Sequence, residues 1–262
     1  MKTDLVSFHI LGESPAMVSL AHWVLTAAPL WDTILMIGER GTGKELLAHA
    51  FHRLGPARGG ELIILDASSL QPSTAESSLF GHELGAFTGA TRRHVGFIES
   101  ARNGTLFIDE ISTLPLGLQR RFLRFLEEGT IIRIGGTKSI RVRTRVIAAS
   151  NRCLFKEVSS RRFLPDLYDR LNVLPLRVPP LREREGDALL LFEAFLGKGS
   201  AERLTHEARE FLFSYPFPGN VRELHHFCRR LAVFCPDGPI RGEDFERHLH
   251  GSHGLNSPAI LG

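Results

Sequence analysis

Residues 33–45 read TILMIGERGTGKE, and this stretch decides the fold of the 262-residue chain. Its apolar beginning is typical of a buried strand, and an amphipathic helical pattern starts at Lys44. Glycines between a strand and a helix let backbone N–H groups turn toward phosphate oxygens, and the helix amino terminus adds its positive dipole end. The stretch therefore predicts a nucleotide-binding P-loop, although these residues alone leave open whether the nucleotide is ATP or GTP.

The predicted phosphate-binding residues are Gly38, Glu39, Arg40, Gly41, Thr42, Gly43, Lys44 and Glu45. Lys44 has the position from which an ammonium group reaches the β- and γ-phosphates. The generic motif ends in Ser or Thr, which binds magnesium, whereas this chain has Glu45. Taken alone, this mismatch weakens the prediction.

A second motif strengthens it. In TLFIDE, residues 105–110, four strand residues precede Asp109 and Glu110. In this arrangement one carboxylate holds magnesium and its neighbour polarises the attacking water. We assign Asp109 to Mg²⁺ and Glu110 to the water. The alternative is a structural glycine turn and an acidic strand end, but both motifs in the expected order favour the nucleotide site.

Apolar runs and helical patterns alternate through the first two thirds of the chain, which predicts an α/β fold with a parallel sheet flanked by helices. Further apolar runs predict buried strands at residues 61–65, 105–109 and 144–150. Helical patterns cover residues 44–54 and 116–128. Ser73 and Glu76 have the spacing of a capping box, which predicts a helix start.

The pattern changes in the proline- and arginine-rich stretch 174–184, after which only helical periodicity is found. We predict a nucleotide-binding domain over residues 1–177, a small all-helical lid domain over 178–250 and a flexible tail over 251–262. The expected lid helices are Asp187–Leu196, Thr205–Ser214 with Thr205 as N-cap, and Asn220–Phe234.

The composition, with 43% hydrophobic and 23% charged residues, is ordinary for a globular protein. No run approaches the roughly 20 apolar residues that a membrane span needs, and no secretory signal is visible, so we expect a cytoplasmic protein. The net charge is +3, and the arginines that produce it are scattered along the chain, so the charge does not by itself indicate nucleic-acid binding. Cys153, Cys228 and Cys235 match no zinc or disulfide spacing, and we expect buried free thiols.

The most specific motif is GAFTGA, formed by Gly85, Ala86, Phe87, Thr88, Gly89 and Ala90. Its glycines allow an excursion of the chain that exposes Phe87 and Thr88 for docking, whereas the alternative is a buried phenylalanine in an ordinary turn. With this hexapeptide the chain resembles the AAA+ domain of bacterial enhancer-binding proteins, the activators of sigma-54 RNA polymerase. The resemblance to this family extends over about residues 10–250 and includes the segments GERGTGKE, GTLFIDEI, RVIAASNR, DLYDRLNV, PPLRERE and FPGNVREL.

The resemblance implies an ATPase that uses ATP and Mg²⁺, assembles into a homo- or hetero-oligomeric ring such as a hexamer, and remodels the closed promoter complex of sigma-54 RNA polymerase. The GAFTGA loop would contact sigma-54. Asn151, with Ser150, would be the first nucleotide sensor, and Arg222 would be the second. A further substrate-facing hairpin is implied within Leu114–Gly136, where GTIIRIGG looks like strand, turn and strand. Glu45 fits this family, whose P-loop ends in GTGKE.

The chain departs from the family at two positions. In this family the arginine-finger segment normally reads Phe-Arg-x-Asp-Leu, with a further arginine six residues after the first. In this chain Leu164 occupies the position of the first arginine, while Arg170 occupies that of the second. Arg161 and Arg162 are candidates to replace the lost charge, or else ordinary exposed loop residues. Asp66 stands where the family has an asparagine that holds the catalytic glutamate in an inactive pose.

Two other functions stay open. Leu164 and Asp66 favour a subunit that binds ATP, hydrolyses it poorly and regulates or co-assembles with a paralogous activator. A direct DNA-binding regulator has the least support, because we find no recognition-helix motif and expect no intrinsic DNA-binding domain.

Overall fold

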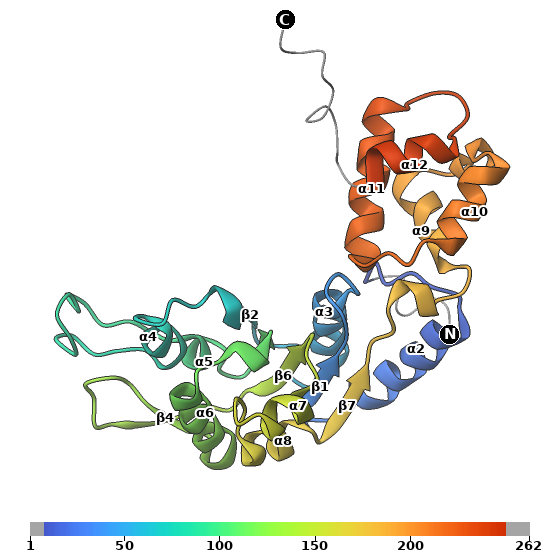
Figure 1. Cartoon of the computed structure of the whole chain (residues 1–262). Helices are drawn as coiled ribbons and strands as arrows, with labels where there is room; N and C mark the ends of the chain where they lie inside the picture. The colour runs from blue at the N-terminus through green and yellow to red at the C-terminus, as the bar shows by residue number, and fades with distance from the viewer. Residues whose placement is uncertain (1–7, 250–262) are drawn as a thin grey trace, which may run out of the picture. The chain divides into compact units, whose positions relative to one another are not determined.

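The computed structural model describes residues 8–249, and their contacts divide them into two compact units (Figure 1). The sheet unit contains residues 20–39 and 44–178, and the helical unit contains residues 8–19, 40–43 and 179–249. The predicted tail at 251–262 lies outside the described residues. The domain boundary near residue 177 stays a prediction.

A five-stranded parallel sheet forms the centre of the sheet unit and confirms the predicted fold class. Its strands follow one another across the sheet as β2 (Leu62–Asp66), β3 (Thr105–Asp109), β6 (Arg145–Ser150), β1 (Ile34–Ile37) and β7 (Leu174–Arg177). Because every pairing is parallel, the carboxyl ends of all five strands lie at the same edge.

The strand β7 was not predicted, because its residues fall in the stretch assigned to a proline-rich connector. It pairs only with β1 and lies at the edge of the sheet. An edge strand tolerates Pro175, since a proline lacks the N–H that an inner strand would need for its second neighbour.

Helices cover both faces of the sheet. One face carries a core in which Leu35, Ile108 and Ala148 pack with Phe122 and Leu167 of α6 and α8. On the other face, the guanidinium of fully buried Arg145 donates to the carbonyls of Phe51 in α3 (2.8 Å) and Ala27 in α2 (3.3 Å). The elements of these layers are α2 (Pro15–Ala27), α3 (Lys44–Leu54), η1 (Ala67–Ser69), α4 (Ala75–Phe80), α5 (Phe97–Ser100), η2 (Ile111–Thr113), α6 (Leu116–Glu128), α7 (Leu154–Ser159) and α8 (Pro165–Leu171).

The predicted helices 44–54 and 116–128 are confirmed as α3 and α6. The predicted capping box is wrong: α4 begins at Ala75, and its N-cap Thr74 has helical backbone angles and makes no side-chain cap. The predicted hairpin is also shifted, because GTIIRIGG contains only β4 (Thr130–Ile132), and the antiparallel partner is β5 (Ser139–Arg141).

The helical unit packs around its own apolar core, which includes Leu191, Leu212, Phe227 and Phe245. Its elements are η3 (Leu181–Glu183), α9 (Asp187–Leu196), η4 (Ser200–Arg203), α10 (His206–Ser214), α11 (Asn220–Phe234) and α12 (Gly242–Leu249). The three predicted lid helices are confirmed, and the Thr205 side chain accepts from the Ala208 N–H at the start of α10. The separate helix α12 was not predicted.

Within residues 8–249, no helix is both long and apolar enough to cross a lipid bilayer. The expectation of buried thiols holds for Cys228 but is wrong for Cys153, which is exposed; Cys235 is half-buried. Burial raises the pKa of the Cys228 thiol to about 12, as expected for an inert core cysteine.

Candidate nucleotide-binding site

Three of the predicted motifs meet at one edge of the sheet because β6 lies between β1 and β3. The P-loop follows β1, Asp109 and Glu110 follow β3, and Asn151 follows β6. The register pairs Ile37 with Ser150, and the Gly38 N–H donates to the Ser150 carbonyl at 3.1 Å. The start of the P-loop is thereby tied to the strand that carries the predicted sensor.

Lys44 begins α3 and is 6% exposed. Its ammonium donates to the carbonyls of Gly38 (3.0 Å) and Glu39 (3.1 Å), so the charge is held against the loop itself. Gly41 and Gly43 have φ values of +75° and +99°, which favour glycine and turn the backbone around the loop. This loop offers a cation, backbone N–H groups and a helix amino terminus to a phosphate.

Glu110 has a left-handed backbone, with φ +53°, which is uncommon for a residue with a side chain. Its N–H donates to the Asp109 carboxylate at 3.0 Å, and its own carboxylate accepts from the Asn151 N–H at 3.4 Å. Glu110 is only 7% exposed. The structure therefore brings both predicted carboxylates and the predicted sensor together.

The side chain of Asn151 supplies an independent sign of a ligand. Its amide oxygen is buried and has no hydrogen-bond partner among the described residues. A buried polar atom without a partner costs free energy unless water or a ligand satisfies it. The oxygen donors of Asp109 and Glu110 are, in addition, the kind that Mg²⁺ prefers. The residues present thus fit a nucleotide with its magnesium.

The tip of the P-loop, residues 40–43, is grouped with the helical unit. The buried side chain of Asn220 donates to the Arg40 carbonyl at 3.0 Å, and the Arg222 N–H donates to the Gly41 carbonyl at 3.3 Å. The guanidinium of Arg184 donates to the Thr42 carbonyl at 2.8 Å. Arg222, the predicted second sensor, therefore lies in the first turn of α11, with its backbone bonded to the tip.

Asn220 and Arg184 were missed as site residues. Both are buried, and burial lowers the pKa of Arg184 to about 10, so the guanidinium still carries its charge at neutral pH. Asn220 has φ +55°, a conformation that asparagine tolerates better than most residues. The sequence signal that could have identified them is their position in segments shared with the family, PPLRERE for Arg184 and FPGNVREL for Asn220.

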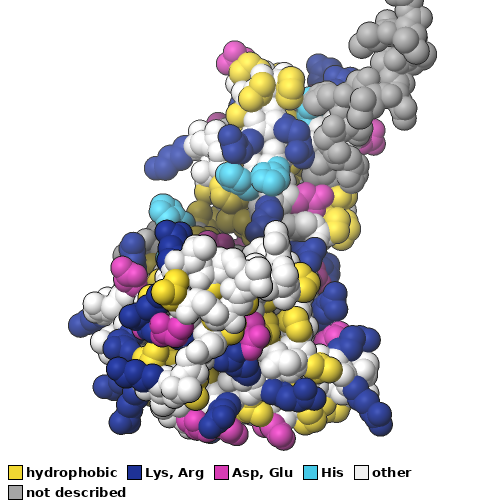
Figure 2. All heavy atoms as spheres, turned by 90° about the vertical axis from the view of Figure 1, so that its left-hand side faces the viewer, with side chains coloured by type: hydrophobic (Ala, Val, Ile, Leu, Met, Phe, Trp, Pro, Cys, Tyr) yellow, Lys and Arg dark blue, Asp and Glu magenta, His cyan; other side chains and the backbone are white. Residues whose placement is uncertain are grey.

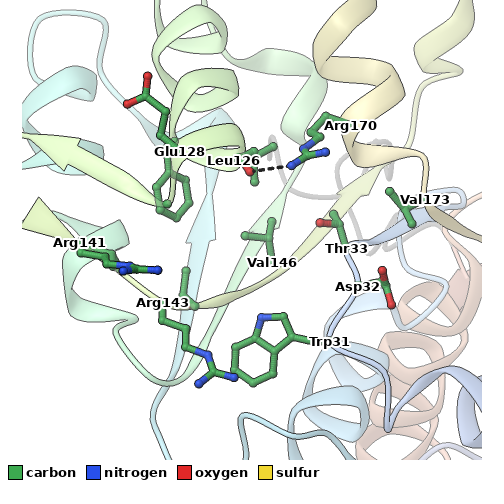
Figure 3. Close-up of a pocket in the computed structure, with 14 residues that line it drawn as sticks. Trp31, Asp32, Thr33, Leu126, Glu128, Arg141, Arg143, Val146, Arg170 and Val173 are labelled. Atoms are coloured by element: carbon green, nitrogen blue, oxygen red, sulfur yellow. Dashed lines mark hydrogen bonds between the residues drawn. The ribbon is translucent and has the colours of Figure 1, made fainter.

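Arg170 does not lie with the other predicted site residues. It is exposed on α8, just before β7, and lies at the opposite edge of the sheet from the P-loop. Its guanidinium donates to the Leu126 carbonyl at 3.3 Å and lines a cavity of about 700 Å³ (Figure 3). In the same cavity the Arg143 guanidinium lies 4.5 Å from the centre of the Trp31 ring. Arg170 cannot act on the nucleotide of its own sheet unit.

Leu164 is the N-cap of α8 and packs against the core. Its N–H donates to the side chain of buried Gln119, which also donates to the carbonyl of Arg162 and so holds this segment. Arg162 pairs with Glu157 at 2.7 Å, and the bond lowers the pKa of that carboxyl. Arg161, with φ +58°, is exposed. Arg161 and Arg162 are the two candidates to replace the arginine that is absent at position 164, and Arg162 already forms an ion pair with Glu157.

The GAFTGA residues form a tight loop. The Gly85 N–H donates to the Ala90 carbonyl at 2.9 Å, and Gly85 and Gly89 have φ values of +77° and +100°. Phe87 is 46% exposed, with its ring against His82. Thr88 is also exposed, so both residues expected to dock are accessible.

A buried arginine joins this loop to the β4–β5 hairpin, and the two project side by side from the sheet unit (Figure 1). Arg133 follows β4, and its side chain is 6% exposed. Its guanidinium contacts the Glu83 carboxylate of the GAFTGA loop at 2.6 Å and the Glu99 carboxylate of α5 at 2.6 Å. Hydrogen bonds to Glu99 and Glu83 raise the pKa of Arg133. A backbone hydrogen bond also joins the two segments, because the Glu83 N–H donates to the Ile134 carbonyl.

Figure 2 views the molecule from the side toward which these loops project. On this face, Lys and Arg side chains are interspersed with acidic and hydrophobic ones and form no single basic patch. This distribution agrees with the scattered arginines and lysines of the sequence.

Comparison with known proteins places this geometry in context. Residues 10–177 match the sigma-54 interaction domain, and residues 182–259 match the AAA+ ATPase lid domain. The chain is 43% identical over 262 aligned residues to the nitric oxide reductase transcription regulator NorR1 of Cupriavidus necator, covering 95% of this chain and 50% of NorR1. It is 42% identical to the DNA-binding transcriptional regulator NtrC of Rhizobium meliloti, covering 92% of this chain and 51% of NtrC.

Among solved structures, the chain is similar to NtrX from Brucella abortus in complex with ATP, with a TM-score of 0.83 and 30% identity. The match covers 92% of this chain and 57% of that one. The chain thus spans about half the length of the curated relatives it matches.

We expect Arg133→Ala to loosen the GAFTGA loop, because the substitution removes charge-assisted hydrogen bonds from two carboxylates. Such a bond contributes about 1.5–3 kcal/mol, so the loss of even one corresponds to a roughly 10- to 100-fold more frequent local opening. Trypsin cleavage after Arg92 and Arg93, measured by mass spectrometry, should accelerate accordingly. The control is Arg124→Ala, which removes an exposed ion pair on α6. Equal cleavage rates in the two variants would show that Arg133 does not hold the loop.

Proposed function

The chain belongs to the sigma-54 interaction domain family, and on that basis we propose that it is an ATP-binding activator that couples ATP hydrolysis to remodelling of the closed promoter complex of sigma-54 RNA polymerase. The observation that carries the proposal is the convergence of Lys44, Glu110 and Asn151 at one edge of the sheet. The exposed GAFTGA loop of the same unit supplies a surface for the polymerase partner.

In this proposal the P-loop and Lys44 bind the phosphates of ATP. Asp109 holds Mg²⁺, which would offset charge on the phosphate oxygens. Glu110 accepts a proton from the attacking water and is kept in position by the Asn151 N–H. Asn151 senses the γ-phosphate through its buried amide, and Arg222 contacts the nucleotide from the start of α11.

Hydrolysis in this proposal requires a neighbouring subunit. Arg170 lies at the edge of the sheet opposite the P-loop, where it can serve the nucleotide of another copy. This supports a ring, such as a hexamer, in which each active site is completed in trans. We further propose a nucleotide-binding domain at residues 1–177, a lid at 178–250, and action in the cytoplasm, where RNA polymerase is found.

Glu110→Gln should bind ATP but lose turnover by about 10²–10⁴-fold, because the amide cannot take a proton from water. ATP binding is measured with a fluorescent analogue, and turnover by phosphate release with Mg²⁺ over a range of protein concentrations. The specific activity of the wild type should rise with concentration as subunits assemble. Glu127→Gln, an exposed change on α6, is the control.

Binding of ATP by the wild type without turnover at any concentration would contradict the ATPase proposal. Equal turnover in Glu110→Gln and the wild type would instead contradict the role assigned to Glu110.

Phe87→Ala should keep ATPase activity but lose nucleotide-dependent binding of sigma-54 by at least about tenfold, because truncating a central aromatic contact removes roughly 2 kcal/mol or more. Binding is measured by co-elution with purified sigma-54 in the presence of a transition-state analogue of ATP. Leu84→Ala is the matched control, since Leu84 is exposed in the same loop but precedes the hexapeptide. Unchanged binding by Phe87→Ala would exclude the proposed docking role.

A second function, a hydrolysis-weak subunit that supports a paralogue, is favoured by one observation: Leu164 packs against the core where an arginine is usual, and neighbouring Arg162 is paired with Glu157. Asp66 is also engaged, because its carboxylate accepts from the N–H and hydroxyl of Ser68 and caps a 3₁₀ turn.

We expect Leu164→Arg to raise ATP turnover, by up to ~10³-fold if the missing charge limits the rate. Leu164→Lys is the matched control, because a lysine lacks the planar fork that binds a phosphate bidentately. Turnover is measured as phosphate release at saturating ATP. No gain in the arginine variant would show that the remaining arginines suffice and would remove Leu164 as support for the weak-subunit function.

A further inference from the structure

We propose that Cys235, Asp244 and His248 form a metal site in the helical unit, with a ligand set that fits Zn²⁺. The site is independent of the nucleotide and of the sigma-54 contact. Its three ligand atoms, a thiol sulfur, a carboxylate oxygen and an imidazole nitrogen, all lie within 4.8 Å of one another.

The two helices at the end of the described chain create this cluster. Cys235 is the C-cap of α11, and α12 begins seven residues later at Gly242. Asp244 and His248 are four residues apart on α12 and therefore point from the same face of the helix. A metal at this place would tie α12 to the end of α11.

The spacing of the ligand atoms is close to that of a bound zinc ion. The Cys235 sulfur lies 3.7 Å from the Asp244 Oδ1 and 3.9 Å from the His248 Nε2. With a Zn–S bond of about 2.3 Å and Zn–N and Zn–O bonds of about 2.0–2.1 Å, neighbouring ligands of a tetrahedral site lie about 3.3–3.6 Å apart. The two sulfur distances exceed this spacing by a few tenths of an ångström, the carboxylate oxygen and the imidazole nitrogen lie within 4.8 Å of each other, and water would be the fourth ligand.

Contacts outside the cluster orient two of the ligands, as supporting bonds do in zinc sites. His248 is 3% exposed, and its ring stacks on Phe234 with an interplanar angle of 6°. The Arg230 guanidinium donates to the His248 carbonyl. The second oxygen of Asp244, Oδ2, accepts from the Arg241 N–H at 2.8 Å, which leaves Oδ1 directed at the sulfur.

A metal ion can reach the cluster from solvent. Cys235 and Asp244 line a hollow of about 400 Å³ that is bordered by the 236–241 turn. Arg203 donates to the carbonyls of Gly238 and Cys235 and so fixes the backbone beside the sulfur. A thiolate and a carboxylate together balance the charge of a divalent cation.

Burial, followed by Asp244, raises the pKa of the Cys235 thiol. On metal binding, the S–H bond breaks, a sulfur–metal bond forms and the proton leaves to solvent. The simple alternative is a thiol that only donates a weak hydrogen bond to Asp244.

Tag-free full chain titrated with Co²⁺, a spectroscopic substitute for Zn²⁺, should bind one equivalent and develop a thiolate-to-cobalt charge-transfer band. Zn²⁺ should displace the cobalt and raise the melting temperature. Cys235→Ser should lose the band, and Asp244→Asn and His248→Gln should weaken Co²⁺ binding by at least about tenfold. Cys153→Ser, which removes the exposed cysteine, and Asp237→Asn, in the 236–241 turn, should bind like the wild type.

Each variant is checked by circular dichroism and by ATP binding, so that unfolding is not mistaken for ligand loss, and Cys235→Ala serves as a second thiol-free variant. Absence of a saturable one-equivalent titration in the wild type would overturn the proposal. So would a charge-transfer band that persists in folded Cys235→Ser or disappears in Cys153→Ser.

Discussion

The parallel pairing of β1, β6 and β3 is the constraint on which the site depends. Because β6 lies between the other two, the loops that follow all three strands end at one edge of the sheet. Lys44, Glu110 and Asn151 come from distant parts of the chain and meet only for this reason. Antiparallel pairing of β6 would carry Asn151 to the other edge, more than a strand length away.

Buried guanidinium groups tie together segments that are distant in the chain. Arg184 binds the carbonyl of Thr42 at the tip of the P-loop, Arg133 joins the GAFTGA loop to α5, and Arg145 ties α2 and α3 to the sheet. A guanidinium can serve several acceptors in a fixed plane, which suits it to joining carbonyl or carboxylate groups from different segments. Removing such a group leaves these acceptors without a hydrogen-bond donor, and the cost in folding free energy is therefore large and falls on the segments that they belong to.

The same topology separates the two halves of the proposed chemistry. The residues proposed to bind phosphate lie at the carboxyl edge of the sheet, and Arg170 lies beside the cavity at the amino edge. In the proposed chemistry, Arg170 is therefore placed away from the carboxyl edge that carries Lys44, Glu110 and Asn151 of the same sheet unit. This division explains why the sequence supports nucleotide binding more directly than rapid turnover, especially with Leu164 at the other arginine position.

The sequence by itself determined the P-loop, four strands and the helices α3, α6, α9, α10 and α11, because their periodicity and glycine positions are local properties. The tertiary structure alone decided the edge strand β7, whose Pro175 belongs to a stretch that resembles a connector, and the start of α4, where the capping box does not form. It also decided the roles of Gln119 and Asn220, which act on backbone groups far away in the chain. The cluster of Cys235, Asp244 and His248 has no recognised spacing, since packing of α12 against α11, rather than a motif, brings its ligands together.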